Sequence, residues 1–82
     1  MPGAVSGHTI GSWYVYQIKA TVLEVQEFYL REMPLAGWEL WYQTGDASQG
    51  ETSIRLNYRK GEEQTAVFMN PAEGGLVQVS IS

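Results

Sequence analysis

The strongest constraint on the fold of this chain is one well-marked helix between residues 21 and 37. Thr21-Val22-Leu23-Glu24 has the pattern of a capping box, in which the side chains of Thr21 and Glu24 each accept a hydrogen bond from the other residue's backbone N–H. Pro34 cannot donate to a carbonyl one turn back, and Gly37 suits the left-handed conformation that often follows a helix. Apolar residues recur between these signals at helical spacing: Val22, Val25, Phe28, Tyr29 and Met33. The pattern predicts a single amphipathic helix.

Alternating, β-branched and aromatic segments on both sides of the helix predict strands. They cover residues 12–20, 38–44, 52–59, 64–70 and 76–81. Strands joined by short turns favour antiparallel pairing, and one helix covers only one face of a sheet. We therefore expect an α+β fold of order β-α-β-β-β-β, with one amphipathic helix packed on one face of a four- to five-stranded, mainly antiparallel sheet.

The length of the chain allows one domain. Its 82 residues have room for a single hydrophobic core, so residues 1–82 are expected to form one α+β domain. Residues 1–11 carry three glycines and a proline without a sustained period, and they are interpreted as a flexible N-terminal segment, with a short strand at Ala4-Val5 as the alternative. The apolar runs are far shorter than the roughly 20 residues that a membrane span needs. We expect no direct membrane insertion.

Alternation also predicts which strand residues face the helix. In residues 38–44, Leu40 and Tyr42 fall on the face of Trp38, and Trp41 falls on the opposite face. Residues 64–70 are apolar on both faces, so the sequence leaves open whether Phe68 or its two neighbours point inward. Polar residues on the water-facing side of 52–59 are expected at Arg55, Asn57 and Arg59.

Composition argues against several functional classes. The net charge is −4, and the five basic residues are scattered, whereas nucleic-acid binding depends on clustered Lys and Arg. Cysteine is absent and His8 is the only histidine, so the sequence offers no converging metal ligands. No serine lies in a nucleophile-elbow pattern, and the glycine pair at 74–75 precedes a strand rather than a helix. We expect no catalytic residues, no metal and no cofactor.

The remaining feature is a set of apolar residues on the sheet face away from the helix. The candidate interface residues are Trp13, Val15, Trp41 and Phe68. Aromatic residues are enriched at protein–protein contacts, so a non-catalytic interaction or structural module is the first hypothesis. The partner would be another protein or a second copy that forms a homodimer, with the polar strand 52–59 at the rim. Alternatively, the N-terminal segment covers this face through Val5 and Ile10.

The second hypothesis is a small-ligand-binding domain. Its pocket would lie between the helix and the sheet, where aromatic side chains converge, and its candidate lining is Tyr14, Tyr16, Phe28, Tyr29 and Trp38. Few polar groups accompany these aromatics, which is more typical of a core than of a pocket. The two hypotheses differ in the molar mass that each predicts in solution.

Several motifs together resemble a known small domain. They are Pro2-Gly3-Ala4, Lys19-Ala20-Thr21, Val25-x-x-Phe28-Tyr29, Leu35-Ala36-Gly37-Trp38-Glu39-Leu40, Tyr58-Arg59-Lys60-Gly61, and a late turn with Pro71 and paired glycines. This pattern is similar to an uncharacterised β-α-β-β-β-β domain that recurs in bacterial envelope proteins and lipoproteins. The resemblance implies the fold and an extracytoplasmic or envelope location, and it implies no catalytic residues.

Overall fold

The computed structural model describes residues 3–11 and 13–82 and shows one helix packed on an antiparallel sheet. The elements in chain order are β1 (Ala4–Ile10), β2 (Trp13–Ile18), α1 (Val22–Leu35), β3 (Glu39–Thr44), the 3₁₀ turn η1 (Ala47–Gln49), β4 (Ile54–Lys60), β5 (Glu63–Pro71), the 3₁₀ turn η2 (Glu73–Gly75) and β6 (Val77–Ile81). The predicted α+β class is confirmed.

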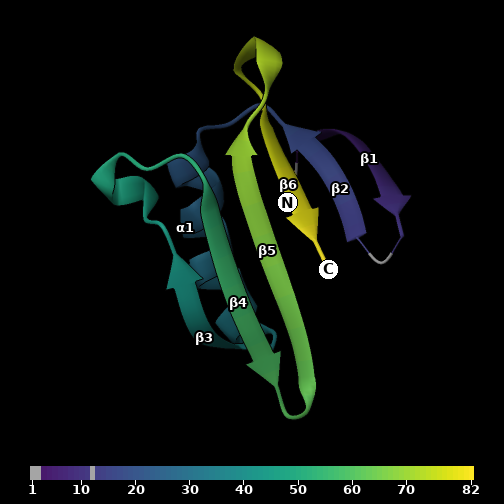
Figure 1. Cartoon of the computed structure of the whole chain (residues 1–82), viewed down its shortest axis with the longest axis vertical. Coiled ribbons are helices and arrows are strands. Elements are labelled where there is room, and N and C mark those ends of the chain that lie inside the picture. Colours follow the sequence, from purple (N-terminus) through teal and green to yellow (C-terminus); the bar gives the residue numbers. More distant parts are fainter. Residues whose placement is uncertain (1–2, 12) are drawn as a thin grey trace.

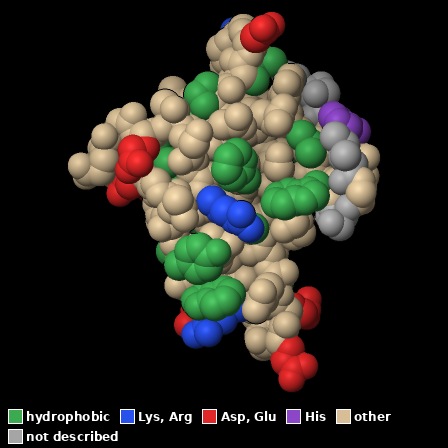
Figure 2. All heavy atoms as spheres, in the orientation of Figure 1, with side chains coloured by type: hydrophobic (Ala, Val, Ile, Leu, Met, Phe, Trp, Pro, Cys, Tyr) green, Lys and Arg blue, Asp and Glu red, His purple; other side chains and the backbone are tan. Residues whose placement is uncertain are grey.

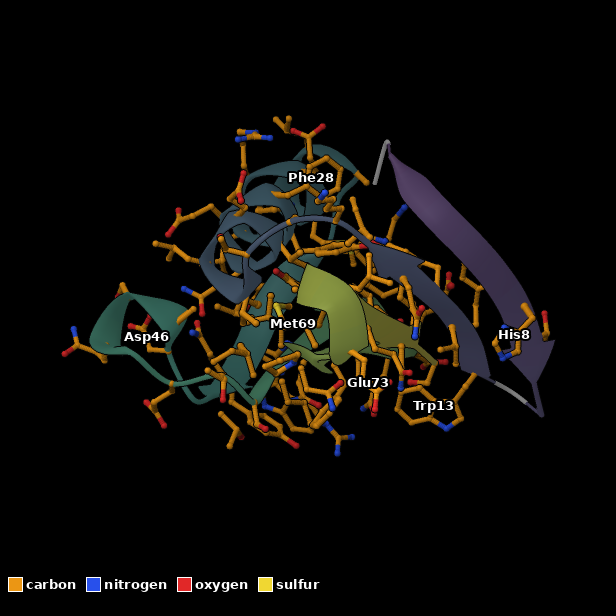
Figure 3. All side chains as sticks on the ribbon, turned by 90° about the horizontal axis from the view of Figure 1, so that it is seen from above. His8, Trp13, Phe28, Asp46, Met69 and Glu73 are labelled. Carbon is orange, nitrogen blue, oxygen red and sulfur yellow. The ribbon has the colours of Figure 1, made fainter. Side chains whose placement is uncertain are left out.

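The sheet has the strand order β1-β2-β6-β5-β4-β3, and all neighbours pair antiparallel. The C-terminal strand β6 therefore lies between β2 and β5 and joins the two halves of the sheet (Figure 1). After β2 the chain forms α1, which crosses one face of the sheet. It then returns to the sheet as β3, the edge strand on the side away from β1. Figure 3 shows the two layers from above, with Phe28 of the helix and Trp13 of β2 on opposite sides of the sheet.

The helix begins and ends close to the predicted signals. The Thr21 hydroxyl accepts a hydrogen bond from the Glu24 N–H at 3.0 Å, and the Glu24 carboxylate accepts one from the Thr21 N–H at 2.9 Å. The capping box is thus confirmed. At the other end, Gly37 has a φ of +90°, which favours glycine, and the Lys60 ammonium donates to the exposed Ala36 carbonyl at 3.1 Å.

The core lies between the helix and the sheet. Its buried members are Tyr16, Ile18, Val22, Val25, Tyr29, Ile54, Leu56, Tyr58, Val67, Met69, Val77 and Val79. Alternate residues contribute to this set from β4 (Ile54, Leu56 and Tyr58) and from the C-terminal half of β5 (Val67 and Met69), as expected for strands with one face in the core. The ambiguity in residues 64–70 is resolved, because Val67 and Met69 are fully buried under the helix and Phe68 lies on the other face.

The number of strands and the path of the N-terminal segment differ from the prediction. The sheet has six strands rather than four to five, because Ala4–Ile10 forms β1 where a flexible segment was expected. Its pairing with β2 runs from Ala4–Ile18 to Ile10–Trp13. This ladder places β1 at the sheet edge, so it does not cross the face opposite the helix. The side chains of Val5 and Ile10 lie outside the described residues.

A β-bulge in β3 overturns the predicted orientation of Tyr42. Leu40 pairs with Tyr58, whereas Tyr42 pairs with Asn57, and the register shifts between these two pairs. A bulge adds one residue to one strand, so strict alternation fails at that point. Tyr42 therefore shares the face of Asn57, away from the helix. Trp38 precedes the strand and is half-buried rather than largely buried.

A buried glutamine joins the helix to the loop after β3. Gln26 is only 2% exposed, and its amide nitrogen donates to the Asp46 carboxylate at 3.0 Å. Its carbonyl oxygen accepts from the Ala47 N–H at 2.8 Å. Hydrogen bonds from Ser48 and Gln26 lower the pKa of the Asp46 carboxyl below its usual value. Both ends of this buried amide are thus satisfied, and the loop is held against the helix.

Candidate functional site

The sheet face opposite α1, called the outer face below, carries a row of paired residues across four strands. Val15 of β2 pairs with Ser80 of β6, which pairs with Phe68 of β5, which pairs with Arg55 of β4. Directly paired residues point to the same side of a sheet. Phe68 therefore lies in the middle of the outer face, beside an arginine.

The bulge in β3 adds two aromatic rings to the outer face. Trp41 and Tyr42 are each about half exposed, and their rings pack edge to face with centroids 5.4 Å apart. The guanidinium of Arg59 lies 6.0 Å from the Trp41 ring centroid, within the range of a cation–π contact. The same guanidinium forms an exposed ion pair with Glu39 at 3.3 Å. Trp41 is thus held between an arginine and a tyrosine.

Arg55 is the one charged residue of the central row, and it has no carboxylate partner among the described residues. The ion pairs found in that part of the chain are Arg31–Glu32 and Arg59–Glu39. Figure 2 shows the outer face, with basic side chains among hydrophobic ones and acidic side chains at the margins. A basic side chain thus lies near the middle of this face, although the net charge of the whole chain is −4.

Next to Arg55 the outer face has an open hollow of about 230 Å³. Small and polar residues of β4 and β5 lie between larger side chains there, and the lining is Trp41, Arg55, Asn57, Tyr58, Gln64, Thr65, Ala66 and Ser82. We call this space the hollow. Its volume is below the range of about 300–1,000 Å³ that holds drug-sized ligands. It suits a group of a few heavy atoms.

Asn57 supplies the most unusual polar group of the hollow. The residue is 6% exposed, and its Nδ2 is buried without a hydrogen-bond partner among the described residues. Its Oδ1 accepts a hydrogen bond from the Nε–H of Arg55 at 3.2 Å, which fixes the orientation of the amide. Buried polar groups are nearly always paired, and an exception needs an explanation.

Comparison with known proteins identifies a family. A family model described as START domain-like matches residues 5–75. This span includes most of the chain, from β1 to the turn before β6.

The chain belongs to the START domain-like family.

Searches of curated proteins and of solved structures give no match. The matched span includes the helix and all the outer-face residues except those of β6.

The outer face of this START domain-like chain contains all four candidate interface residues. Trp13 and Phe68 are half-buried, Val15 is 9% exposed and Trp41 is 50% exposed. Strands β2 and β3 are not neighbours, since β6, β5 and β4 lie between them. Trp13 and Trp41 therefore lie on strands that are not neighbours, and Phe68 lies on a strand between them.

Sequence reasoning missed three residues of this site. Tyr42 was assigned to the opposite face because a bulge leaves no clear signal in the alternation. Arg55 and Asn57 were interpreted as water-facing residues of a rim, but β4 is an inner strand and places them between Phe68 and Trp41. The sequence offers one signal for these two residues. The polar residues Arg55 and Asn57 lie on a strand whose preceding and following strands in the sequence each carry an aromatic residue, Trp41 and Phe68.

The candidate pocket residues between helix and sheet take different positions. Tyr16 and Tyr29 are buried and their hydroxyls are hydrogen bonded to each other, while Tyr14 is 47% exposed. Phe28 and Trp38 are half-buried at the margin of the core. Binding of a ligand among these aromatics stays a prediction.

Burial also sets the acidity of the core tyrosines. Burial raises the pKa of Tyr16 and of Tyr29, and the hydrogen bond between the two hydroxyls raises the pKa of Tyr29 further. The Tyr58 hydroxyl donates to the Tyr29 carbonyl at 3.2 Å, and burial raises its pKa to about 12. Three hydroxyls and one carbonyl are thus linked by hydrogen bonds within the core.

Within residues 3–11 and 13–82 there is no cluster of three His, Cys, Asp or Glu side chains that could hold a metal ion. His8 lies on the edge strand β1 and is exposed. No helix in the same ranges has the length and apolar character of a membrane span.

Proposed function

We propose that this domain is a non-catalytic protein-interaction module, and that the outer face is its binding surface. The observation that carries the proposal is the arrangement of half-exposed aromatic side chains around Arg55, an arginine with no carboxylate partner among the described residues. Trp, Tyr and Arg are the residues that most often dominate binding energy at protein interfaces. The chemistry of this face is therefore that of a binding surface.

Charge complementarity favours an acidic partner over a second copy. A two-fold dimer through this face would bring the same arginine-containing surface against itself, because an isologous contact uses one patch twice. Like charges that face each other across an interface cost free energy, whereas an acidic segment would pair with Arg55. The occupant that we propose is a protein segment that carries carboxylates next to an aromatic side chain.

Membership of the START domain-like family supports a second candidate, a small ligand held between α1 and the sheet. Folds of this type often bind ligands. Tyr14, Phe28 and Trp38 would border that site, because they are the aromatics there that are not fully buried. An envelope or extracytoplasmic location, implied by the sequence resemblance, also remains a prediction.

The proposal is tested by titration of the ¹⁵N-labelled domain with two matched peptides. One peptide is Ac-Gly-Glu-Tyr-Glu-Gly-NH₂, and in the other both glutamates are replaced by glutamine. We expect the acidic peptide to shift backbone amide resonances of β4 and β5 in a saturable way, and the neutral peptide to bind at least about tenfold more weakly, because it lacks the charged groups that would pair with Arg55. Shifts confined to α1 and β2 would favour the second candidate and contradict the proposal.

Two variants and a sedimentation experiment complete the test. The double variant Trp13→Ser/Trp41→Ser should lose most of the peptide affinity, about tenfold or more, because it removes two aromatic anchors. The control is Leu35→Ser, which removes an apolar side chain that is 78% exposed on the helix. Sedimentation of the wild-type domain should show a monomer. A wild-type dimer that the double variant abolishes would identify a second copy as the occupant and overturn the acidic partner.

A further inference from the structure

We propose that the hollow is a carboxylate-binding subsite, in which Arg55 and the unpartnered Nδ2 of Asn57 hold the two oxygens of one carboxylate. This inference rests on the proposed function, and it names the group of the partner that the outer face recognises: the side chain of an aspartate or glutamate.

The two donors are held together by a hydrogen bond of their own. The Nε–H of Arg55 donates to Oδ1 of Asn57 at 3.2 Å, so the two side chains lie side by side at the hollow. This bond uses only one of the five N–H groups of the guanidinium and leaves the terminal amines for another acceptor. Nδ2 of Asn57 is itself buried, so a carboxylate reaches this second donor only after a small shift of the side chains around it.

The amide nitrogen of Asn57 determines which kind of atom can bind to it. Nδ2 can only donate, so its partner must be an acceptor, and a buried donor without a partner is destabilising. An acceptor that also approaches Arg55 gains most if it is negatively charged. A carboxylate meets both conditions, because its two oxygens can accept from two different donors at the same time.

The remaining walls fit the methylene groups that carry such a carboxylate. Ala66 is a small residue beside Asn57 in the ladder, and Trp41 presents an exposed indole on the other side. The volume of about 230 Å³ admits a short acidic side chain and is too small for a lipid or a nucleotide. Arg59 is not a competitor for this anion, because its guanidinium already pairs with Glu39 at 3.3 Å.

The test uses acetate as the probe, with acetamide as its neutral analogue, at constant ionic strength set with sodium chloride. The readouts are the side-chain NH₂ resonances of Asn57 and the Nε–H resonance of Arg55 in the wild-type domain. We expect acetate to shift both in a saturable way with one dissociation constant. Acetamide and chloride should leave both resonances unchanged.

Three variants assign the effect to the hollow. Arg55→Gln should weaken acetate binding about tenfold or more, and Asn57→Ala about two- to tenfold, in line with the loss of a charged donor and of a neutral donor to the carboxylate. Arg31→Gln is the matched control and should bind acetate within about twofold of wild type, since this arginine pairs with Glu32 on α1, on the other side of the sheet. Equal losses in Arg55→Gln and Arg31→Gln would show a diffuse charge effect and overturn the subsite.

The outcomes separate this inference from the proposed function. If the acidic peptide binds the outer face but acetate leaves the Asn57 side chain unmoved, the subsite is wrong and the interaction surface stands. If acetate binds in the hollow but the acidic peptide and its glutamine analogue bind equally or not at all, the proposed function is wrong and the hollow is a site for free small carboxylates. Because the wild-type resonances report directly, the result does not depend on whether Asn57→Ala folds.

Discussion

Two glycines in the loop between β3 and β4 allow the steric cost of one added methyl group to be measured as a loss in the free energy of unfolding. Gly45 and Gly50 both have positive φ, +81° and +84°. A Cβ on Gly45 would lie 2.6 Å from the Ser53 carbonyl oxygen and 3.0 Å from the Cδ1 of buried Ile54. A Cβ on Gly50 would meet no atom within 4 Å. The two glycines therefore have nearly the same φ angle, but only Gly50 has room for an added Cβ.

Replacement by alanine should separate these two contributions. The left-handed conformation costs a residue with a Cβ about 1–2 kcal/mol, and the reduced freedom of the unfolded chain returns about 0.4–1 kcal/mol. Gly50→Ala should therefore lower the free energy of unfolding by roughly 1 kcal/mol. At Gly45 the clash is with backbone, which cannot rotate away, and overpacking adds about 1–3 kcal/mol. Gly45→Ala should cost about 2–4 kcal/mol, a large part of the roughly 4–12 kcal/mol expected for a domain of this length.

The assay is urea unfolding followed by far-ultraviolet circular dichroism, with wild type and both variants measured side by side. A shift of the midpoint at constant slope shows that stability alone has changed. Costs for Gly45→Ala and Gly50→Ala that agree within about 0.5 kcal/mol would refute the steric argument, because backbone conformation would then explain both.

Two further predictions concern the helix and the core. Thr21→Ala should lower the free energy of unfolding by about 0.5–2 kcal/mol through loss of the cap, and an unchanged urea midpoint would contradict it. The raised pKa values of Tyr16, Tyr29 and Tyr58 mean that the folded state disfavours their ionisation. Their contribution to stability is therefore full below about pH 10, the unfolded pKa, and is lost as the pH rises toward 12 and beyond. The tyrosinate absorbance that belongs to Tyr16, Tyr29 and Tyr58 should appear above the ordinary tyrosine pKa of about 10, and its complete appearance near that value would count against this burial.

The sequence predicts the elements of this fold well because local signals agree there with tertiary packing. Thr21 and Glu24 form the expected cap, and residues 52–59 alternate with one buried face, as the structure shows. The prediction failed where long-range pairing decides. Residues 4–10 lack a clear alternation and become a strand because they pair with β2 along its length, with a register shift between Ala4 and Ser6.

The candidate site was predicted only in part for related reasons. Trp13 and Phe68 can be recognised from the sequence because the strands carry more apolar residues than the one sheet face covered by α1 can bury. Arg55 and Asn57 are ordinary residues for a solvated strand, and only the strand order shows that they lie between aromatics. Gln26 illustrates the same limit, because the partners that allow this polar side chain to be buried lie 20 and 21 positions later in the chain.

The bulge in β3 has a consequence for how this domain can diverge among its relatives. Leu40 and Tyr42 pair with Tyr58 and Asn57, which are consecutive on β4. Deletion of Trp41 would leave a strand that alternates regularly, in which Leu40 still pairs with Tyr58 and Tyr42 with Asn57. Insertion of a residue at the same place would restore the bulge. An insertion or deletion at this point would therefore change the outer face by one aromatic ring and leave the two flanking pairs in register. The aromatic content of this face depends in this way on the length of β3, while the sequence of the buried face stays the same.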